Sequence, residues 1–286
     1  MKKTLLTILS LLLIVGCSQK PVDETTLIEK DGVMYLPDSN EPYNGEVFTN
    51  YSSGEKEYQG TYENGLLVSY SYLNKDGSVK EPVNMETLID RGGNLFEING
   101  QKPYTGDVFE LYDNGNRKLS GILKGGIKDG LFTEWYENGQ KKIQVSLKDG
   151  KLDGLWTKWY KNGHKWIEGT YKDGNRDGLW TEWHENGQKS SEGSFINGDG
   201  SFLDHLGIPE NGKDGLWTYW YEDGQKKFEI NYEDGTKNGL FTSWFKNGQK
   251  SMEVIFKDGG YDGLLTSWYE NGQKESENTY KNEEID

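Results

Sequence analysis

A ten-residue pattern of apolar and polar positions recurs along most of the chain. Its consensus reads Gly-Leu-Trp-Thr-Glu-Trp-Tyr-Glu-Asn-Gly, and the strong copies begin at Gly130, Gly154, Gly178, Gly215, Gly239 and Gly263. Successive copies start 24, 24, 37, 24 and 24 residues apart, so the long interval holds a 13-residue insertion within 196–214. A fixed period of this length is typical of repeat proteins, in which each repeat buries its apolar face against its neighbours.

Each copy predicts one β-hairpin. Positions two to seven are rich in aromatic residues and Thr, which favour strands, and the Asn-Gly or Asp-Gly pair that follows favours a tight turn. We expect a three-residue loop with Gly163 in the left-handed conformation, which places Thr157 opposite Ile167. A further Asp-Gly pair then turns the chain into the next hairpin.

This register assigns the side chains of a hairpin to two faces. Apolar residues alternate along the second strand, so we expect its apolar face to be buried. The predicted buried face carries Leu155, Thr157, Trp159, Ile167, Gly169 and Tyr171. The predicted opposite face carries Trp156, Lys158, Tyr160, Trp166 and Glu168.

The aromatic residues of the repeats form two columns. The first is predicted to be core, with binding as the alternative, and consists of Trp135, Trp159, Trp183, Trp220, Trp244 and Trp268. Two interpretations of the second column remain open. A single-layer sheet would expose the column as a ladder on which sugars or peptides could stack, whereas a curled sheet would bury it. The candidate binding residues in this column are Trp156, Tyr160, Trp180, Trp217 and Tyr221.

The chain upstream of the strong copies is duplicated. Weaker copies begin at Gly45 and Gly106, a degenerate one begins at Gly65, and the segments around the first two repeat at an offset of 61 residues. We therefore predict one all-β domain of tandem antiparallel hairpins over 26–286, forming an elongated twisted sheet. Its predicted parts are duplicated blocks at 26–86 and 87–129, then six hairpin repeats over 130–283.

Composition supports an all-β fold and narrows the partners. The chain has 38 Gly and no Ala, which argues against helix bundles and doubly wound α/β folds. Its 10 Trp, 18 Tyr and 10 Phe can bury large areas despite few aliphatic residues. The formal charge of −15 argues against a nucleic-acid partner, because a phosphate-backbone binder needs a basic face.

The first residues resemble a bacterial lipoprotein signal. Lys2 and Lys3 precede an apolar run that is too short to span a bilayer, and Ile-Val-Gly-Cys17 resembles a lipobox. We expect a signal peptide at 1–16, lipidation of Cys17 and a polar tether at 17–25; the alternative is a plain signal peptide. Cys17 is the only cysteine, so no disulfide and no cysteine metal site is expected. By the same resemblance, Ser18 suggests the outer membrane or cell surface.

The repeat itself resembles a known family. The consensus, continued by Gln-Lys and later by Tyr-Lys-Asp-Gly, resembles the bacterial variant of the MORN repeat over nearly all of 45–283. The organisation of the whole chain resembles the YwqK family, usually described as antitoxin or immunity proteins. The lipobox departs from that family, because a lipid-anchored protein would not reach an intracellular toxin.

No catalytic residue, metal or cofactor is expected. His164, His184 and His205 are interpreted as exposed positions, and no known metal-binding spacing is present. The segment 207–214 lacks the hydroxyl residue that completes a phosphate loop, and 197–201 lacks the ligand series of a calcium loop. We therefore do not expect an enzyme.

The remaining candidate binding residues lie in the insertion, namely Phe202, Leu203, Leu206 and Ile208. They are interpreted either as a local plug over the sheet or as an apolar patch for a partner. The favoured function is a non-enzymatic, membrane-anchored scaffold that binds a protein or another envelope ligand. The alternatives are an antitoxin or immunity protein that binds a toxin, and a glycan-binding surface protein.

Overall fold

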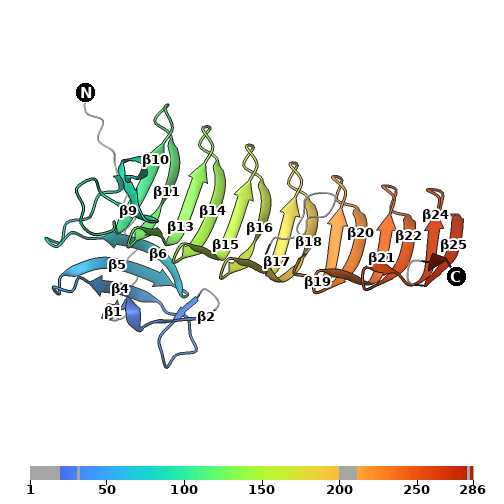
Figure 1. The fold of residues 1–286 in the computed structure, drawn as a ribbon, viewed down its shortest axis with the longest axis horizontal. Helices are drawn as coiled ribbons and strands as arrows, with labels where there is room; N and C mark the ends of the chain where they lie inside the picture. The colour runs from blue at the N-terminus through green and yellow to red at the C-terminus, as the bar shows by residue number, and fades with distance from the viewer. Residues whose placement is uncertain (1–19, 31–32, 200–210, 282–283, 286) are drawn as a thin grey trace, which may run out of the picture. The chain divides into compact units, whose positions relative to one another are not determined.

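The computed structural model describes residues 20–30, 33–199, 211–281 and 284–285, and its contacts divide the chain into two compact units, Met1–Lys80 and Glu81–Asp286. This division falls inside the single domain predicted over 26–286. The described residues contain no α-helix, only two single 3-10 turns, η1 (Glu24–Thr26) and η2 (Met85–Thr87). Consecutive antiparallel hairpins make up most of the fold, which confirms the predicted all-β class (Figure 1).

Unit 2 is dominated by one long sheet whose strands follow one another in chain order. Its strands are β7 (Val83–Asn84), β10 (Gly106–Leu111), β11 (Arg117–Lys124), β12 (Ile127–Lys128), β13 (Gly130–Trp135), β14 (Lys141–Lys148), β15 (Lys151–Trp159), β16 (Lys165–Lys172), β17 (Asn175–Trp183), β18 (Lys189–Gly198), β19 (Lys213–Trp220), β20 (Lys226–Glu233), β21 (Thr236–Trp244), β22 (Lys250–Lys257), β23 (Gly260–Tyr261), β24 (Gly263–Trp268), β25 (Lys274–Lys281) and β26 (Glu284–Ile285). The sheet is open: β7 pairs with β10 at one end, β26 pairs with β25 at the other, and no described pair joins these ends.

Every hairpin of the long sheet contains a bulge that shifts the register by one residue. The predicted loop is correct as far as Trp159, which pairs with Lys165, and Gly163 has the expected positive φ of 88°. Trp166 is then the extra residue of a bulge, so Thr157 pairs with Glu168 and not with Ile167. A shift of one residue moves a side chain to the other face of a strand. The predicted assignment of the first strand to the buried face is therefore wrong.

We call the two sides of the unit 2 sheet the inner face and the outer face. The hairpin of β15 and β16 belongs to the second of the six strong repeats and is called the second hairpin below. Its inner face carries Trp156, Ile167 and Gly169, whereas its outer face carries Leu155, Thr157, Glu168 and Thr170. Burial is concentrated on the inner face. Its core cluster consists of Ile167, Trp180, Phe195, Trp217, Tyr219, Ile230 and Tyr232.

The inner face is packed by placing glycine against large rings. A Cβ on Gly169 would lie 2.1 Å from the ring of Trp180, and one on Gly193 would lie 2.2 Å from the ring of Trp217. Both tryptophans are only 2% exposed. Where the second strand carries Val145 instead, the facing aromatic residue is only half-buried. The small residue therefore admits the neighbouring ring fully into the core.

Hydrogen bonds between successive turns tie each hairpin to the next. The hydroxyl of Tyr136 donates to the carbonyl of Trp159 at 2.9 Å, and that of Tyr160 donates to Trp183 at 2.8 Å. Amide side chains of the same turns add a second contact, as Asn162 does to the carbonyl of Glu185. We call this series the turn ladder. It couples each hairpin only to its neighbour in the sequence.

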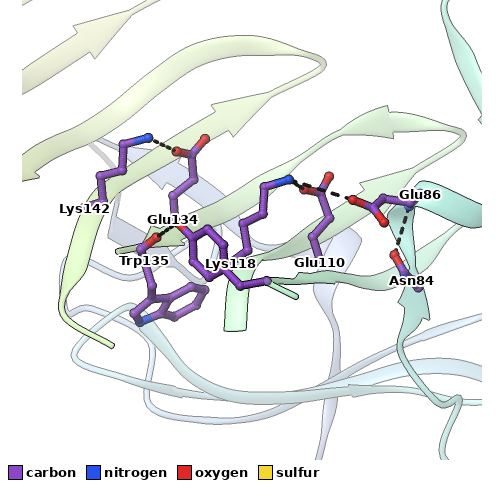
Figure 2. A network of polar contacts seen from close by, with 8 residues as sticks. Asn84, Glu86, Glu110, Lys118, Glu134, Trp135 and Lys142 are labelled. Atoms are coloured by element: carbon purple, nitrogen blue, oxygen red, sulfur yellow. Dashed lines mark hydrogen bonds and ion pairs between the residues drawn. The ribbon is translucent and has the colours of Figure 1, made fainter. Parts of the chain in front are cut away.

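Ion pairs cross the first hairpins of unit 2 near their turns (Figure 2). The ammonium of Lys118 lies 2.9 Å from the carboxylate of Glu110 and 3.8 Å from that of Glu86, in the turn that follows β7. Lys142 and Glu134 form the corresponding pair in the next hairpin, at 3.3 Å. Solvent reaches both lysines and most of their carboxylate partners and screens the attraction, so these pairs are expected to add little to stability.

Unit 1 is a small sheet that repeats the beginning of unit 2. Its main sheet has the order β1-β4-β5-β6, and its core cluster consists of Leu27, Tyr43, Val47, Tyr58 and Tyr62. Its strands are β1 (Val22–Asp23), β2 (Ile28–Lys30), β3 (Val33–Tyr35), β4 (Gly45–Asn50), β5 (Lys56–Glu63) and β6 (Leu66–Tyr72). Unit 2 contains the equivalents of the first five as β7, β8 (Ile89–Arg91), β9 (Asn94–Phe96), β10 and β11, each 61 residues later.

Candidate functional site on the outer face

The outer face presents a regular row of exposed leucines. The residue after the first glycine of each strong repeat lies on this face, and in every copy about half of its surface is exposed. The exposed fractions are 50% for Leu131, 48% for Leu155, 58% for Leu179, 52% for Leu216, 48% for Leu240 and 49% for Leu264. Two strands per hairpin separate successive leucines by about 10 Å.

A polar network lies beside the leucines and fixes the surface around them. In the second hairpin, Thr157 donates to the carboxylate of Glu168 at 3.2 Å, and Lys165 pairs with the same carboxylate at 2.5 Å. The same contacts join Thr218, Glu229 and Lys226 in a later hairpin. The threonine of this network is buried beneath its partners in most repeats. On the outer face, therefore, the polar groups of the network bond to one another, and the leucines beside them remain exposed to solvent.

The lysine of the network also reaches the tryptophan of the next repeat. Lys165 lies 5.5 Å from the ring centre of Trp183, and Lys226 lies 5.8 Å from that of Trp244. The six tryptophans of this column are half-buried. The prediction that they form the core is wrong, because the bulge removes them from the inner face. They link neighbouring repeats through cation–π contacts.

The second aromatic column divides between core and turn ladder. Trp180 and Trp217 are buried, so they cannot serve as an exposed stacking ladder, and Trp156 is half-buried against the ring of Trp180. Tyr160 and Tyr221 are half-buried and donate their hydroxyls to the turn ladder. Of the two readings of this column, the structure supports burial.

Near the turns of unit 2, the structure leaves Trp166 and Tyr269 exposed among the described aromatic residues. Trp166 is 39% exposed and stacks on Tyr160 with ring centres 5.4 Å apart. Lys158 lies 3.9 Å from the centre of the Trp166 ring. Other hairpins carry a charged or small polar residue at this bulge, so the group belongs to the second hairpin and does not form a ladder.

The other candidates lie outside the described residues. These are Cys17, Phe202, Leu203, Leu206 and Ile208. The base of the insertion is described: strand pairing continues across it, with Phe195 opposite Lys213, and Ile196 donates to the carbonyl of Gly212 at 2.7 Å. The insertion therefore leaves the sheet between two hairpins without interrupting it.

Sequence reasoning missed the cations that cover the inner aromatic column. The guanidinium of Arg176 lies 4.3 Å from the ring centre of Trp180. Lys213 is fully buried, donates to the hydroxyl of Tyr219 at 3.1 Å, and lies 4.7 Å from the ring centre of Trp217. A signal was present, because a basic residue four positions before the inner aromatic residue recurs in several repeats.

The described histidines take part in the turn ladder. One ring nitrogen of His184 lies 3.0 Å from the carbonyl of Trp220, at the position of the tyrosine in other repeats, and a ring nitrogen of His164 lies 2.8 Å from the carbonyl of Glu185. In the part of the chain that the structure describes, no three His, Cys, Asp or Glu side chains are placed to hold a metal ion. No helix within those same residues is long and apolar enough to cross a bilayer.

Comparison with known families places this geometry among MORN repeats. The family model described as MORN repeat variant matches five segments: 128–149, 152–173, 176–197, 213–234 and 261–282. The five matched segments are therefore MORN-type repeats, and the long sheet that they build is a repeat scaffold. The unmatched segment 237–258 forms the same hairpin from β21 and β22. Among proteins with curated functions, no relative matches the chain.

Proposed function

We propose that this protein is a non-enzymatic, membrane-anchored scaffold that holds a protein partner against the outer face of unit 2. The observation that carries the proposal is the row of six leucines, each about half exposed at the same position of consecutive repeats. Isolated exposed leucines are ordinary, but a regular apolar row on a rigid sheet is a surface that association can bury.

The chemistry of the outer face defines the partner. Apolar side chains about 10 Å apart would match the spacing of the leucines. The chain carries a formal charge of −15, which favours a partner with basic residues and speeds encounter with it. The partner is therefore an elongated, basic protein surface with a regular apolar row.

The anchor in this proposal rests on Cys17 and the lipobox-like sequence before it. Lipidation would hold the scaffold at the bacterial cell envelope, at the outer membrane or cell surface. Replacing Cys17 with Ser should move the protein from the membrane fraction to the soluble fraction. If the variant stays in the membrane fraction, the anchor part of the proposal fails.

Two alternative functions, antitoxin and glycan binding, place different demands on the structure. The antitoxin function implied by the resemblance to the YwqK family is a narrower form of this proposal, in which the partner is a toxin. A toxin gene beside this one would favour it. The glycan-binding alternative rested on an exposed aromatic ladder, and the burial of Trp180 and Trp217 removes that ladder.

The test of the outer face compares two sets of substitutions. A partner captured from envelope extract is identified, purified and titrated against the protein. Changing Leu155, Leu179 and Leu216 together to Ser should weaken binding at least about tenfold, because the apolar area buried at each leucine is lost. The matched control is Ile98→Ser, which changes a residue 61% exposed in a loop outside the long sheet. Equal binding by the triple variant and the parent would refute the proposal.

A further inference from the structure

Unit 1 contains an unfinished hairpin. The five strands that both units share end with β5 in unit 1 and with β11 in unit 2. The next strand begins a further hairpin in both units: it is β6 in unit 1, and β12 followed by β13 in unit 2. The correspondence extends to the turn ladder, because Tyr51 donates to the carbonyl of Leu73 just as Tyr112 donates to that of Trp135. The two strands are therefore equivalent positions of one repeat design.

The two hairpins diverge after their turns. Both turns close with the same backbone bonds, from Asn74 to the carbonyl of Ser78 in unit 1 and from Tyr136 to that of Gln140 in unit 2. In unit 2 the return strand β14 then pairs along the length of β13. In unit 1 the return stops at Lys80, which donates to the carbonyl of Tyr72, and Pro82 follows, which cannot donate to a ladder.

The first half of β6 is consequently an exposed apolar strand at the end of its sheet. The sheet order ends with β6, and the exposed fractions are 54% for Leu66, 40% for Leu67 and 52% for Val68. No charged residue occurs in Leu66–Tyr72. Proteins commonly protect such edges with charged residues, and β25, next to the last strand of the unit 2 sheet, carries Lys274, Glu275 and Glu277. Strand β6 lacks that protection.

We propose that β6 is an assembly strand, and that β6 of a second copy of this chain pairs with it in antiparallel orientation. The two four-stranded sheets then form one continuous sheet about a twofold axis, and the partner strand takes the place that β14 occupies in unit 2. This interface is separate from the leucine row of the proposed scaffold function.

The sequence of β6 fits a copy of itself. A twofold axis perpendicular to the sheet keeps equivalent faces on the same side, so the Tyr70 and Tyr72 side continues into the matching side of the partner. Serines occupy the alternate positions, as polar residues alternate along β14. Because the strand is uncharged, self-pairing places no like charges opposite one another.

The test measures association of the full chain carrying Cys17→Ser, so that neither a lipid nor a disulfide can join two copies. Sedimentation equilibrium should show a concentration-dependent dimer of the 32.6 kDa chain. Changing Leu66 and Val68 together to Lys should raise the dimer dissociation constant at least about tenfold, because each of the two paired strands then carries two ammonium groups that repel those of the other copy. The melting temperature of each variant confirms that it folds.

The matched control replaces two equally exposed residues on strands that already have partners on both sides. Leu155→Lys with Leu179→Lys should leave the dimer intact, since these residues lie on the outer face of unit 2. A monomeric parent chain at all concentrations would overturn the proposal. So would a dimer that survives the β6 substitutions, or one that the control substitutions weaken equally.

Cysteine cross-linking tests the strand itself. In the Cys17→Ser background, Ser69→Cys lies on β6 and Thr279→Cys lies on β25, both at exposed positions. Oxidation should join two Ser69→Cys chains and leave Thr279→Cys chains separate. Cross-linking through Thr279→Cys alone would show that copies meet through the last strands of unit 2, and would refute pairing through β6.

Discussion

The two faces of the unit 2 sheet use the same residue types for opposite purposes. On the inner face, aromatic rings pack into the space left by glycine and are covered by Arg176 and Lys213. On the outer face, tryptophans stay half-buried beneath lysines, and leucines remain exposed. The difference shows that two things decide which aromatic residues become core in this fold: the face on which the bulge places them, and the size of the residue opposite them on the inner face.

The comparison predicts the largest loss on the inner face. Trp180→Ala should lower the free energy of unfolding by about 3–5 kcal/mol, because it leaves a cavity over Gly169. Trp183→Ala, in the same strand but on the half-buried column, should cost clearly less. Denaturant unfolding of both variants measures the difference. Equal losses would mean that the two columns contribute alike and would remove the distinction between the faces.

A pair of compensating substitutions tests the contact between glycine and the aromatic ring. Gly193→Val should destabilise the protein by about 1–3 kcal/mol or more, because a Cβ there lies 2.2 Å from the Trp217 ring. Adding Trp217→Leu should recover part of that loss, since the pair then resembles Val254 and Leu265 in the last hairpins. If the double variant is as unstable as the sum of the single ones, the two residues do not share one space.

A smaller effect of opposite sign is expected at Ser191. This side chain is 2% exposed on the inner face, and its hydroxyl has no hydrogen-bond partner among the described residues. Equivalent positions carry Ile143, Ile167 or Phe228. Ser191→Ala should therefore stabilise the protein by about 1 kcal/mol, because it removes an unsatisfied polar group. A lower melting temperature for this variant would show that the hydroxyl is bonded in solution.

The smallest effect on stability is expected on the outer face. Leu155→Ser should change the free energy of unfolding by no more than about 0.5 kcal/mol, because half of the side chain is already in water. The same substitution is expected to weaken partner binding if the leucine row is the docking surface. A loss of stability comparable with that of Trp180→Ala would instead assign the leucines to the core.

The sequence was sufficient to predict the hairpin repeat, its period and the turn, because Gly, Asn and Asp mark turns through their backbone preferences. It was misleading about the faces. Trp166 occupies the bulge that reverses them, and nothing in one hairpin distinguishes a bulged residue from a paired one. The better signal was the pairing of Gly169 with a tryptophan eleven residues later, which becomes visible only when hairpins are compared across their shared edge.

The end of unit 1 was harder to foresee for a different reason. The sequence marks Gly65 as the start of a degenerate repeat. Whether this repeat completes a hairpin depends on where its second strand stops. Lys80 makes the last ladder bond, and Pro82 ends the possibility of another. The sequence contains this proline, but its consequence appears only once β6 is seen to lie at the end of its sheet.

The turn ladder has a consequence for how such a chain changes length. The hydroxyl of Tyr136 bonds to the carbonyl of Trp159, and that of Tyr160 bonds to the carbonyl of Trp183. Each ladder bond therefore joins a hairpin only to the next hairpin in the sequence. Duplicating or deleting one 24-residue unit would therefore keep the same type of turn-ladder bond between neighbouring hairpins and change their number. Each added or deleted repeat would lengthen or shorten the unit 2 sheet by about 10 Å, so the length of this surface can evolve through the number of repeats.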